Sequence, residues 1–318
     1  MIVVAMLGIA TSAAWFFSRI HEPVALTDDV LVEVPFGMSV TRLADELSFA
    51  VPSWQIRTWA RLTHGDGPIL AGHYRLEAGM STADILELLR RGDVVTFDIT
   101  FPEGLTFATW LEILAADSRV TQTGLSADDL AAAVGHEGSI EGWLFPETYR
   151  FETGTTDLEL LTRAYRKMQA VLAEAWAART VDGILESPRD ALILASIVEK
   201  ETGRPEDREL IARVFLNRLE IDMRLQSDPT VIYGLGESFD GDLRRRDLRN
   251  PHVYNTYAHR GLPPGPICMP GRAAIRAVLH AAEAPYFYFV ARGDGSSQFS
   301  VTLDEHNAAV NRYQRGGN

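Results

Sequence analysis

Two carboxylates end a short apolar run in the middle of the chain, where a general acid could be placed. The run ALILASIV, residues 191–198, holds one polar side chain, Ser196, and is followed directly by Glu199, Lys200 and Glu201. A carboxyl group at the end of a buried segment is desolvated, and this raises its pKa and keeps it protonated near neutral pH. A protonated carboxyl is the group that donates a proton in glycosidic bond cleavage.

Helix geometry separates the two glutamates. Helical side chains lean toward the N-terminus and cover the residues three and four positions earlier. Glu199 then lies over the small Ala195 and Ser196, which leave space beside its carboxyl group, whereas Glu201 lies over the bulky residues 197–198. The helix dipole also disfavours a negative charge in this last turn. Glu199 is therefore the candidate acid, although the helix alone leaves open that both glutamates are its solvated end.

The helix that carries these acids is expected over residues 188–201. The segment SPRD, residues 187–190, supplies a serine N-cap, a first-turn proline and the acid of a capping box, and Gly203 fits the C-terminal cap. Because the helix is apolar nearly all round, we expect it in the core. Amphipathic helices are expected on either side of it, over residues 158–177 and 205–219.

Other catalytic motifs are absent from the sequence. There is no H-E-x-x-H or C-x-x-C, and the eight histidines are scattered, so we expect neither a metal site nor a cofactor. Ser196 and Lys200 do not have the S-x-x-K spacing of penicillin-binding proteins, and G-x-S-x-G does not occur. The net charge of −13 argues against nucleic acid or anionic lipid as the main partner. Cys268 is the only cysteine, which excludes an intrachain disulfide.

The N-terminus predicts a membrane anchor. No charged side chain occurs between Met1 and Phe17, close to the roughly 17-residue minimum for a membrane span. A cleaved signal peptide is the alternative, but it would normally carry Lys or Arg before the apolar run, and none is present. We assign a transmembrane anchor to residues 1–20 and a polar linker to residues 21–29. Charge does not set the orientation, because Arg19 follows the span and nothing basic precedes it.

A strand, a Gly-x-Ser/Thr turn and an amphipathic helix recur three times, which predicts an α+β fold. The turns and N-caps of the three units are supplied by Gly37 and Ser39, Gly79 and Ser81, and Gly104 and Thr106. The first two units form a small α/β module at residues 30–95. The third opens a larger mixed α+β domain at residues 96–318.

The second half of the larger domain is rich in loops, where binding residues concentrate. Its loops include LQSDPTVIYGLG and PHVYNTYAHRGLPPGPICMPG, and a β-hairpin is expected around residues 293–295. Upstream, EGWLFPETY at residues 141–149 places aromatic side chains beside two acids. These aromatics suit either a sugar-binding wall or, as the default, the core.

These motifs closely resemble those of the YceG-like (MltG) family of endolytic murein transglycosylases. The resemblance is carried, in order, by EGWLFPETY, LASIVEKET, RVFLNRLEIDMRLQSDPTVIYGLG, YNTYAHRGLPPGPICMPG, PYFYFVARGDGSSQFS and His306-Asn307. It extends over nearly the whole chain. It implies a transmembrane helix, a small LysM-like module and a catalytic domain in which a buried helix carries the catalytic glutamate.

The resemblance also implies which residues form the site. The family's catalytic acid is the first glutamate of its I-V-E-K-E-T motif, which is Glu199 in this chain. The residues expected to bind substrate or support the site are Gln226, Ser227, Asp228, Thr230, Tyr233, Asn255, Thr256, Tyr257 and Glu147.

The activity implied is cleavage of the bond between MurNAc and GlcNAc inside nascent peptidoglycan strands, which limits strand length. A lytic transglycosylase leaves a 1,6-anhydro-MurNAc end and needs only one carboxyl group, first as acid and then as base. The implied place is the inner membrane, with a single span and the catalytic domain in the periplasm. The implied partners are glycan strands and peptidoglycan synthases.

Three other functions are kept as alternatives. A hydrolase would activate water with a second carboxylate, Asp228 or Glu147. A membrane-anchored scaffold would bind glycan for the wall-synthesis machinery without cleaving it. A pyridoxal-dependent aminodeoxychorismate lyase, a label sometimes attached to this family, ranks last because Lys200 has no visible pyridoxal-phosphate cradle around it.

Overall fold

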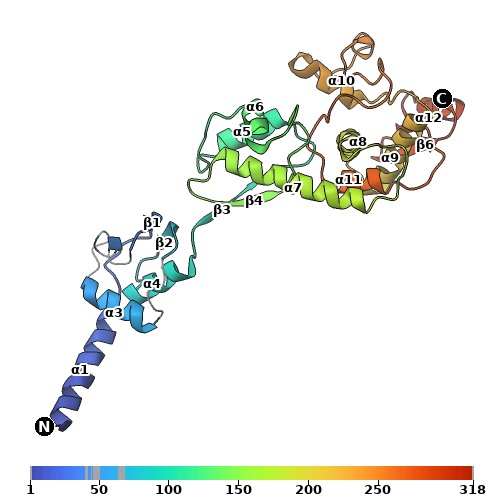
Figure 1. Ribbon diagram of the computed structural model, residues 1–318. Helices are drawn as coiled ribbons and strands as arrows, with labels where there is room; N and C mark the ends of the chain where they lie inside the picture. The colour runs from blue at the N-terminus through green and yellow to red at the C-terminus, as the bar shows by residue number, and fades with distance from the viewer. Residues whose placement is uncertain (1, 40–41, 44, 46–50, 64–68, 317–318) are drawn as a thin grey trace. The chain divides into compact units, whose positions relative to one another are not determined.

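The computed structural model describes residues 2–39, 42–43, 45, 51–63 and 69–316 (Figure 1). Within them the chain is mixed α+β, with eleven α-helices and three two-stranded sheets, which confirms the predicted fold class. Contacts divide the chain into two compact units. The first unit is Met1–Asp98 with Arg150–Thr155, and the second is Ile99–Tyr149 with Thr156–Asn318. The domain limits taken from the sequence stay predictions.

The N-terminal helix α1 (Ile2–Ile20) is long and apolar enough to cross a membrane. Its window Val3–Ile20 has a mean hydropathy of 1.5 and is 6% buried. A core helix of this composition would be covered by other elements, whereas the side chains along α1 are exposed. The helix is therefore a candidate membrane span.

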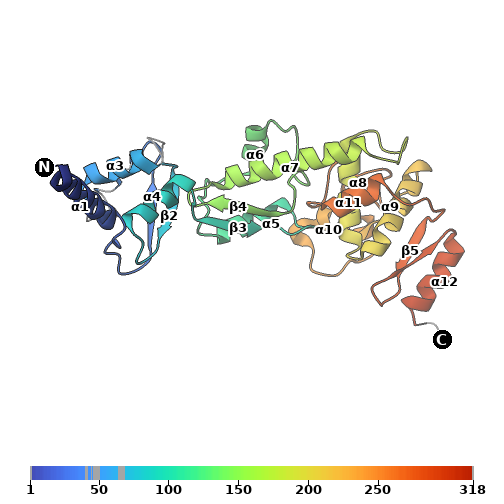
Figure 2. The same ribbon diagram turned by 90° about the horizontal axis from the view of Figure 1, so that it is seen from below.

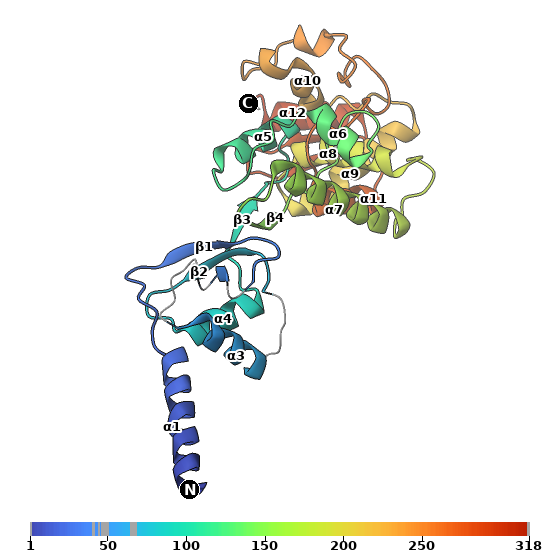
Figure 3. The same cartoon turned by 60° about the vertical axis from the view of Figure 1, so that its left-hand side comes forward.

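The small module of the first unit is built on an antiparallel ribbon (Figure 3). Strand β1 (Val30–Val34) pairs with β2 (Gly72–Leu76), and the alternation along β2 buries Tyr74 and Leu76 against helix α4 (Thr82–Arg91). Gly79 has φ +89°, which turns the chain between β2 and α4.

N-caps in the module occur where the sequence predicts them. Ser81 and Asp84 form a capping box at the start of α4, and Ser39 Oγ accepts a hydrogen bond from the Arg42 N–H at 3.2 Å. The helix expected after Ser39, including Leu47, lies largely outside the described residues. In the segment expected as a linker, Val24 packs into the module core and donates its N–H to Met80 O at 2.8 Å.

Helix α8 (Pro188–Glu201) is the centre of the second unit (Figures 1 and 2). It contacts four other helices: α7 (Asp157–Ala177), α9 (Pro205–Glu220), α10 (Asp228–Leu235) and α11 (Arg272–Leu279). Every residue from Ala191 to Val198 is buried, which confirms the predicted core helix. The burial of this apolar surface is the main stabilising contribution of the helix.

Both ends of α8 are as predicted, but its C-terminal cap is not. Ser187 and Asp190 form the capping box, and Pro188 stands in the first turn. At the other end the cap residue is Thr202, with an extended backbone (φ −150°), and Gly203 is not among the glycines with positive φ. The predicted glycine cap is therefore wrong. Pro205 starts the next helix, and it favours an extended backbone in the residue directly before it, Arg204, whose ψ is 121°.

The structure has further elements between residues 96 and 313. They are β3 (Thr96–Thr100) paired with β4 (Thr148–Glu152), α5 (Phe107–Ala116), α6 (Ala127–Val134), two short 3₁₀ helices (Gly236–Ser238 and Asp247–Arg249), the hairpin of β5 (Tyr288–Ala291) and β6 (Ser297–Ser300), and α12 (Leu303–Tyr313). The hairpin confirms the turn expected at residues 293–295.

Ser196, the one polar side chain in the buried part of α8, holds a neighbouring loop in place. Its hydroxyl donates to Ile193 O at 2.7 Å and accepts from the Ile267 N–H at 3.0 Å. The carbonyl of Ser196 accepts from the thiol of Cys268 at 3.3 Å. The Ile267 N–H and the Cys268 thiol are both buried, so water cannot accept hydrogen bonds from them and Ser196 provides the acceptors.

We predict that Ser196→Ala lowers the free energy of unfolding by about 1–3 kcal/mol, because the buried Ile267 N–H loses its acceptor. Denaturant unfolding of the detergent-solubilised chain measures the change. Ser296→Ala is the matched control, since its hydroxyl bonds Asp294 in an exposed turn, and it should change stability by less than about 0.5 kcal/mol. An unchanged midpoint for Ser196→Ala would contradict the assigned role.

Candidate active site

Glu199 lies in the last turn of α8 with its carboxyl group half-buried between two loops. Oε2 accepts a hydrogen bond from the Gly271 N–H at 3.0 Å, where Gly271 caps the start of α11. Gly104 lies on the other side, and a Cβ added there would be 3.7 Å from Glu199 Cγ. The backbone of Gly104 therefore packs close to the side chain of Glu199.

The surroundings of Glu199 favour its protonated form. Burial is the largest cause and raises the pKa of the carboxyl group above its ordinary value. The Gly271 hydrogen bond opposes this shift, the charge of Glu103 adds to it, and the cations Arg208 and Lys200 oppose it. The sequence predicts this upward direction of the pKa shift for a general acid.

Glu103 is the second carboxylate at this position. The Glu103 carboxyl group lies so close to Gly271 that any side chain added there would collide with it. Gly271 also donates its N–H to Glu199, so both acids lie against the same glycine. Glu103 is exposed, and it belongs to the turn that Gly104 makes with φ +76°.

The turn that carries Glu103 is fixed by backbone bonds to the segment 266–271. Gly104 N–H donates to Met269 O, and Met269 N–H donates to Leu105 O, both at 2.8 Å. Lys200 Nζ also donates to Gly104 O at 3.2 Å. Two loops that are far apart in the sequence therefore meet at the end of α8 and place Glu103 beside Glu199.

Glu201 turns to a different group of residues. Its Oε1 accepts from Ser227 Oγ at 2.6 Å, and burial raises its pKa to about 7. The bulky residues beneath Glu201 were expected to leave it no room for a ligand, and its carboxyl group instead meets the loop before α10. Ser227 N–H in turn donates to Thr256 Oγ1 at 3.0 Å, and Thr230 and Thr256 share a hydrogen bond of 2.9 Å.

Six of the residues expected to bind substrate or support the site come together around this contact. They are Gln226, Ser227, Asp228, Thr230, Thr256 and Tyr257. Ser227, Thr230 and Thr256 are buried and connect the two loops, whereas Gln226 and Asp228 are exposed. Tyr257 donates to Asp228 Oδ1 at 2.6 Å. The exposed members are the ones that a ligand can reach.

Gln226 has a backbone conformation that is rare for its residue type. Its φ is +52°, in the left-handed region that ordinarily favours glycine. Its N–H donates to Thr256 O at 3.2 Å, and this bond holds the strained residue in place while its side chain stays exposed. Strain of this kind is often found where a side chain must point at a ligand.

The other predicted site residues lie elsewhere in the second unit. Tyr233 donates to Glu141 Oε2 at 3.5 Å, Asn255 donates to three carbonyls of the loop 247–250, and Glu147 is exposed and pairs with Lys167 at 3.7 Å. Asn255 therefore shapes a loop from a buried position.

Glu141 is a buried acid that the sequence reasoning did not single out. Its two oxygens accept from the Phe107 N–H at the start of α5, at 3.1 and 3.2 Å, and burial raises its pKa to about 7. The next residue, Gly142, packs against Pro266 too closely for any side chain. Gly142, the second residue of EGWLFPETY, therefore packs against the start of the segment 266–271. Of the aromatics in this motif, Phe145 and Tyr149 belong to the core.

Glu103 was also missed, and a signal for it was present. The segment FPEGLTF was analysed only for its glycine turn and its threonine cap, although the acid stands directly before the glycine. Among the residues that the structure describes, no group of three or more His, Cys, Asp or Glu side chains is placed to hold a metal ion.

The chain is similar to proteins of one family. The profile of the YceG-like family matches residues 32–312. A Bacillus subtilis (strain 168) protein named endolytic murein transglycosylase is 31% identical over 306 residues, which cover 89% of this chain and 84% of that protein. A protein of the same name from Streptococcus pneumoniae (strain D39) is 30% identical over 320 residues, and the match covers 88% of this chain but only 58% of the pneumococcal protein.

The chain is also similar to a solved structure of a yceG-like protein. The crystal structure of a yceG-like protein from Listeria monocytogenes matches with a TM-score of 0.56 at 29% identity and covers 88% of this chain and 99% of that one.

We predict opposite shifts of the Glu199 pKa for two neutral substitutions. Glu103→Gln removes a negative charge and lowers the Glu199 pKa, whereas Lys200→Met removes a positive charge and raises it. Carboxyl ¹³C chemical shifts of glutamate-labelled protein, followed against pH and assigned with Glu199→Gln, measure both shifts. Movement of both variants in the same direction would show that charge is not the cause.

Proposed function

Because this chain belongs to the YceG-like family, we propose that it is an endolytic murein transglycosylase whose general acid is Glu199. The observation that carries the assignment of the acid is the half-buried Glu199 carboxyl group, whose pKa is raised by burial and which accepts the Gly271 N–H at the start of α11. The name of its curated relatives supports cleavage inside glycan strands.

The first chemical step is proton transfer from Glu199 to the oxygen that joins MurNAc to the next GlcNAc. The C1–O bond breaks, and positive charge develops at C1 in an oxocarbenium-like transition state. The exposed carboxylate of Glu103 lies on the far side of Gly271 and provides negative charge near this position. That charge favours the transition state and also raises the pKa of Glu199.

The second step closes the anhydro ring. Glu199, now ionised, removes the proton from the MurNAc 6-hydroxyl, and the freed oxygen attacks C1 of the same sugar. The attack is intramolecular, so proximity lowers its barrier and no water molecule is consumed. One carboxyl group thus returns to its protonated form, and no metal ion or organic cofactor takes part.

The loops beside Glu201 are proposed to bind the glycan. Gln226 and Asp228 present exposed polar groups, and Tyr257 adds a ring whose hydroxyl is already bonded to Asp228. Ser227, Thr230, Tyr233, Asn255 and Thr256 are assigned to holding these loops, because they are wholly or partly buried and bonded within the protein. Glu147, paired with Lys167, is the weakest of the assignments.

The place of action follows from α1 and the family. We assign α1 as a single span in the inner membrane, residues 30–95 as a LysM-like module, and the catalytic domain to the periplasm. Glycan strands still attached at the membrane are then the substrate within reach, and peptidoglycan synthases are the expected neighbours.

We predict that Glu199→Gln reduces cleavage of uncrosslinked glycan strands by at least about 10²-fold, the contribution typical of general acid catalysis. Glu201→Gln is the matched control, two residues further on, because its amide oxygen can still accept from Ser227. It should stay within about tenfold of the wild type. Circular dichroism and glycan pull-down check that fold and binding are kept. Undiminished cleavage by the Glu199 variant would reject this residue as the acid.

We predict that the products end in 1,6-anhydro-MurNAc. Mass spectrometry identifies such ends, because they are lighter than reducing ends by one water, about 18 Da. Internal fragments with this deficit are the expected result. Ordinary reducing ends would instead indicate a hydrolase with a second carboxylate, for which Asp228 and Glu147 are the candidates from the sequence and Glu103, which lies against Gly271, is a third. Release of terminal disaccharides alone would exclude endolytic cleavage, and binding without products would indicate a glycan-binding scaffold.

A further inference from the structure

Helix α3 (Ser53–Thr63) lies against the last turns of α1, within the first unit. Gln55 Nε2 donates to Phe16 O at 3.1 Å, and the Trp59 ring lies 5.5 Å from Phe17 and 5.2 Å from His21. Ile20 and Ile56 are both fully buried in one small cluster. The contact is therefore a packed one and involves the end of α1 at which its apolar run stops.

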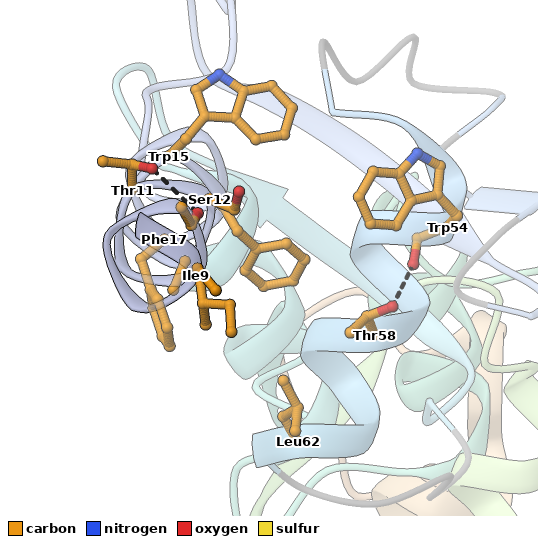
Figure 4. Close-up of a pocket in the computed structure, with 12 residues that line it drawn as sticks. Ile9, Thr11, Ser12, Trp15, Phe17, Trp54, Thr58 and Leu62 are labelled. Carbon is orange, nitrogen blue, oxygen red and sulfur yellow. Dashed lines mark hydrogen bonds between the residues drawn. The ribbon is translucent and has the colours of Figure 1, made fainter. Parts of the chain in front are cut away.

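The two helices lie crosswise. Figure 4 looks along α1, whose turns are seen end-on, while α3 runs lengthwise beside it, and Figure 1 shows α3 lying across the C-terminal end of α1. If α1 crosses a bilayer, a helix set across its end runs along the membrane surface.

A groove of about 960 Å³ lies in the angle between these helices (Figure 4). From α3 it is lined by the stripe Trp54, Thr58 and Leu62, spaced four residues apart. From α1 it is lined by Ala5, Gly8, Ile9, Thr11, Ser12, Ala13, Trp15, Phe16 and Phe17. Most of the groove's lining on α1 precedes residue 16, where the contact with α3 begins, so the groove lies on the membrane side of α3.

The stripe on α3 is unusual for a surface in water. Trp54 is 53% exposed and Leu62 is 69% exposed, although both are large and apolar. The same helix carries Arg57 and Arg61 and no acid, in a chain with a net charge of −13. Exposed tryptophan and leucine together with arginine are the composition of helices that lie in the membrane interface.

We propose that α3 is an interfacial helix that rests on the bilayer and that phospholipid acyl chains fill the groove between α3 and α1. Trp54, Thr58 and Leu62 face the acyl chains, and the arginines of α3 lie at the level of the lipid phosphates. This inference rests on α1 being a membrane span but not on the proposed catalytic activity.

Lipid suits this groove better than a second copy of the chain. The groove opens along the part of α1 that the bilayer surrounds, where acyl chains are already present at high concentration. Its walls include small residues of α1, whose surface a flexible chain can follow closely. The positive charge of α3 matches anionic headgroups and would repel α3 of another copy.

The experiment places an environment-sensitive fluorophore at single cysteines in the full-length chain reconstituted into phosphatidylethanolamine–phosphatidylglycerol vesicles. Leu62→Cys tests the position of α3. Val4→Cys, at a residue of α1 that is 74% exposed, reports whether α1 spans the membrane. Glu33→Cys on β1 is the control that stays in water. The wild-type chain gives the labelling background, since its one thiol, Cys268, is buried.

Vesicles with a nitroxide at carbon 5 of the acyl chain should quench the probe at position 62 at least about twofold, because interfacial helices reach the acyl boundary. The probe at position 33 should be quenched by aqueous iodide instead. A quenched probe at position 4 with an unquenched one at 62 would reject the role of α3 and leave the anchor standing. If neither is quenched by lipid, the span itself is wrong and the inference fails with it.

The second-copy alternative has its own readout. Energy transfer between differently labelled chains at position 62 that persists when the lipid-to-protein ratio is raised would overturn the lipid assignment. Glycan cleavage by the labelled chains is measured in parallel, so failure of this inference cannot be mistaken for failure of the proposed activity.

Discussion

The site depends on one segment, residues 266–271, being held against the buried helix α8. Ser196 accepts its Ile267 N–H, and Glu199 accepts its Gly271 N–H. The helix thus supplies one acceptor from its interior and one from its last turn, and the two N–H groups that they hold are four residues apart in the segment. Because Ser196 is enclosed by core side chains, the first bond fixes the segment against a rigid surface, and the position of Gly271 follows from it.

That segment in turn fixes two other parts of the chain. Met269 exchanges backbone hydrogen bonds with the turn that carries Glu103, and Pro266 packs against Gly142. Two glycines make these contacts as close as they are, since a side chain at Gly142 or Gly271 would collide with its neighbour. The position of Glu103 next to Glu199 therefore follows from the packing of the backbone that carries Glu103 and not from contacts of the Glu103 side chain.

The local parts of this arrangement could be predicted from the sequence, and the non-local parts could not. Helix α8 was predicted to its first and last residues, because its cap, proline and apolar run are all local signals. Glu199 was preferred over Glu201 from the size of the residues beneath them, but the bond from Ser227 to Glu201 was not foreseen. The partner residues lie 26 positions apart, and side-chain spacing within one helix says nothing about a loop that arrives from elsewhere.

Glu103 and Glu141 were missed for the same reason. The loop of Glu103 reaches α8 across 96 residues at its contact with Lys200, and Glu141 reaches the start of α5 across 34. An acid before a glycine, or at the start of an aromatic motif, is ordinary until the fold shows what it meets. The motif resemblance did place Gln226, Ser227, Asp228, Thr256 and Tyr257 together, because it carries three-dimensional information that periodicity lacks.

The packing of α3 across the end of α1 has a mechanical consequence for the small module. A protein joined to a bilayer by one helix can spin about that helix and lean in any direction. Helices α1 and α3 are held at a fixed angle to each other by the buried pair Ile20 and Ile56 and by the hydrogen bond from Gln55 to Phe16. In the proposed arrangement, with α1 in the bilayer and α3 along its surface, two helices held at a fixed angle would transmit torque and keep the module at a fixed height and tilt above the lipid.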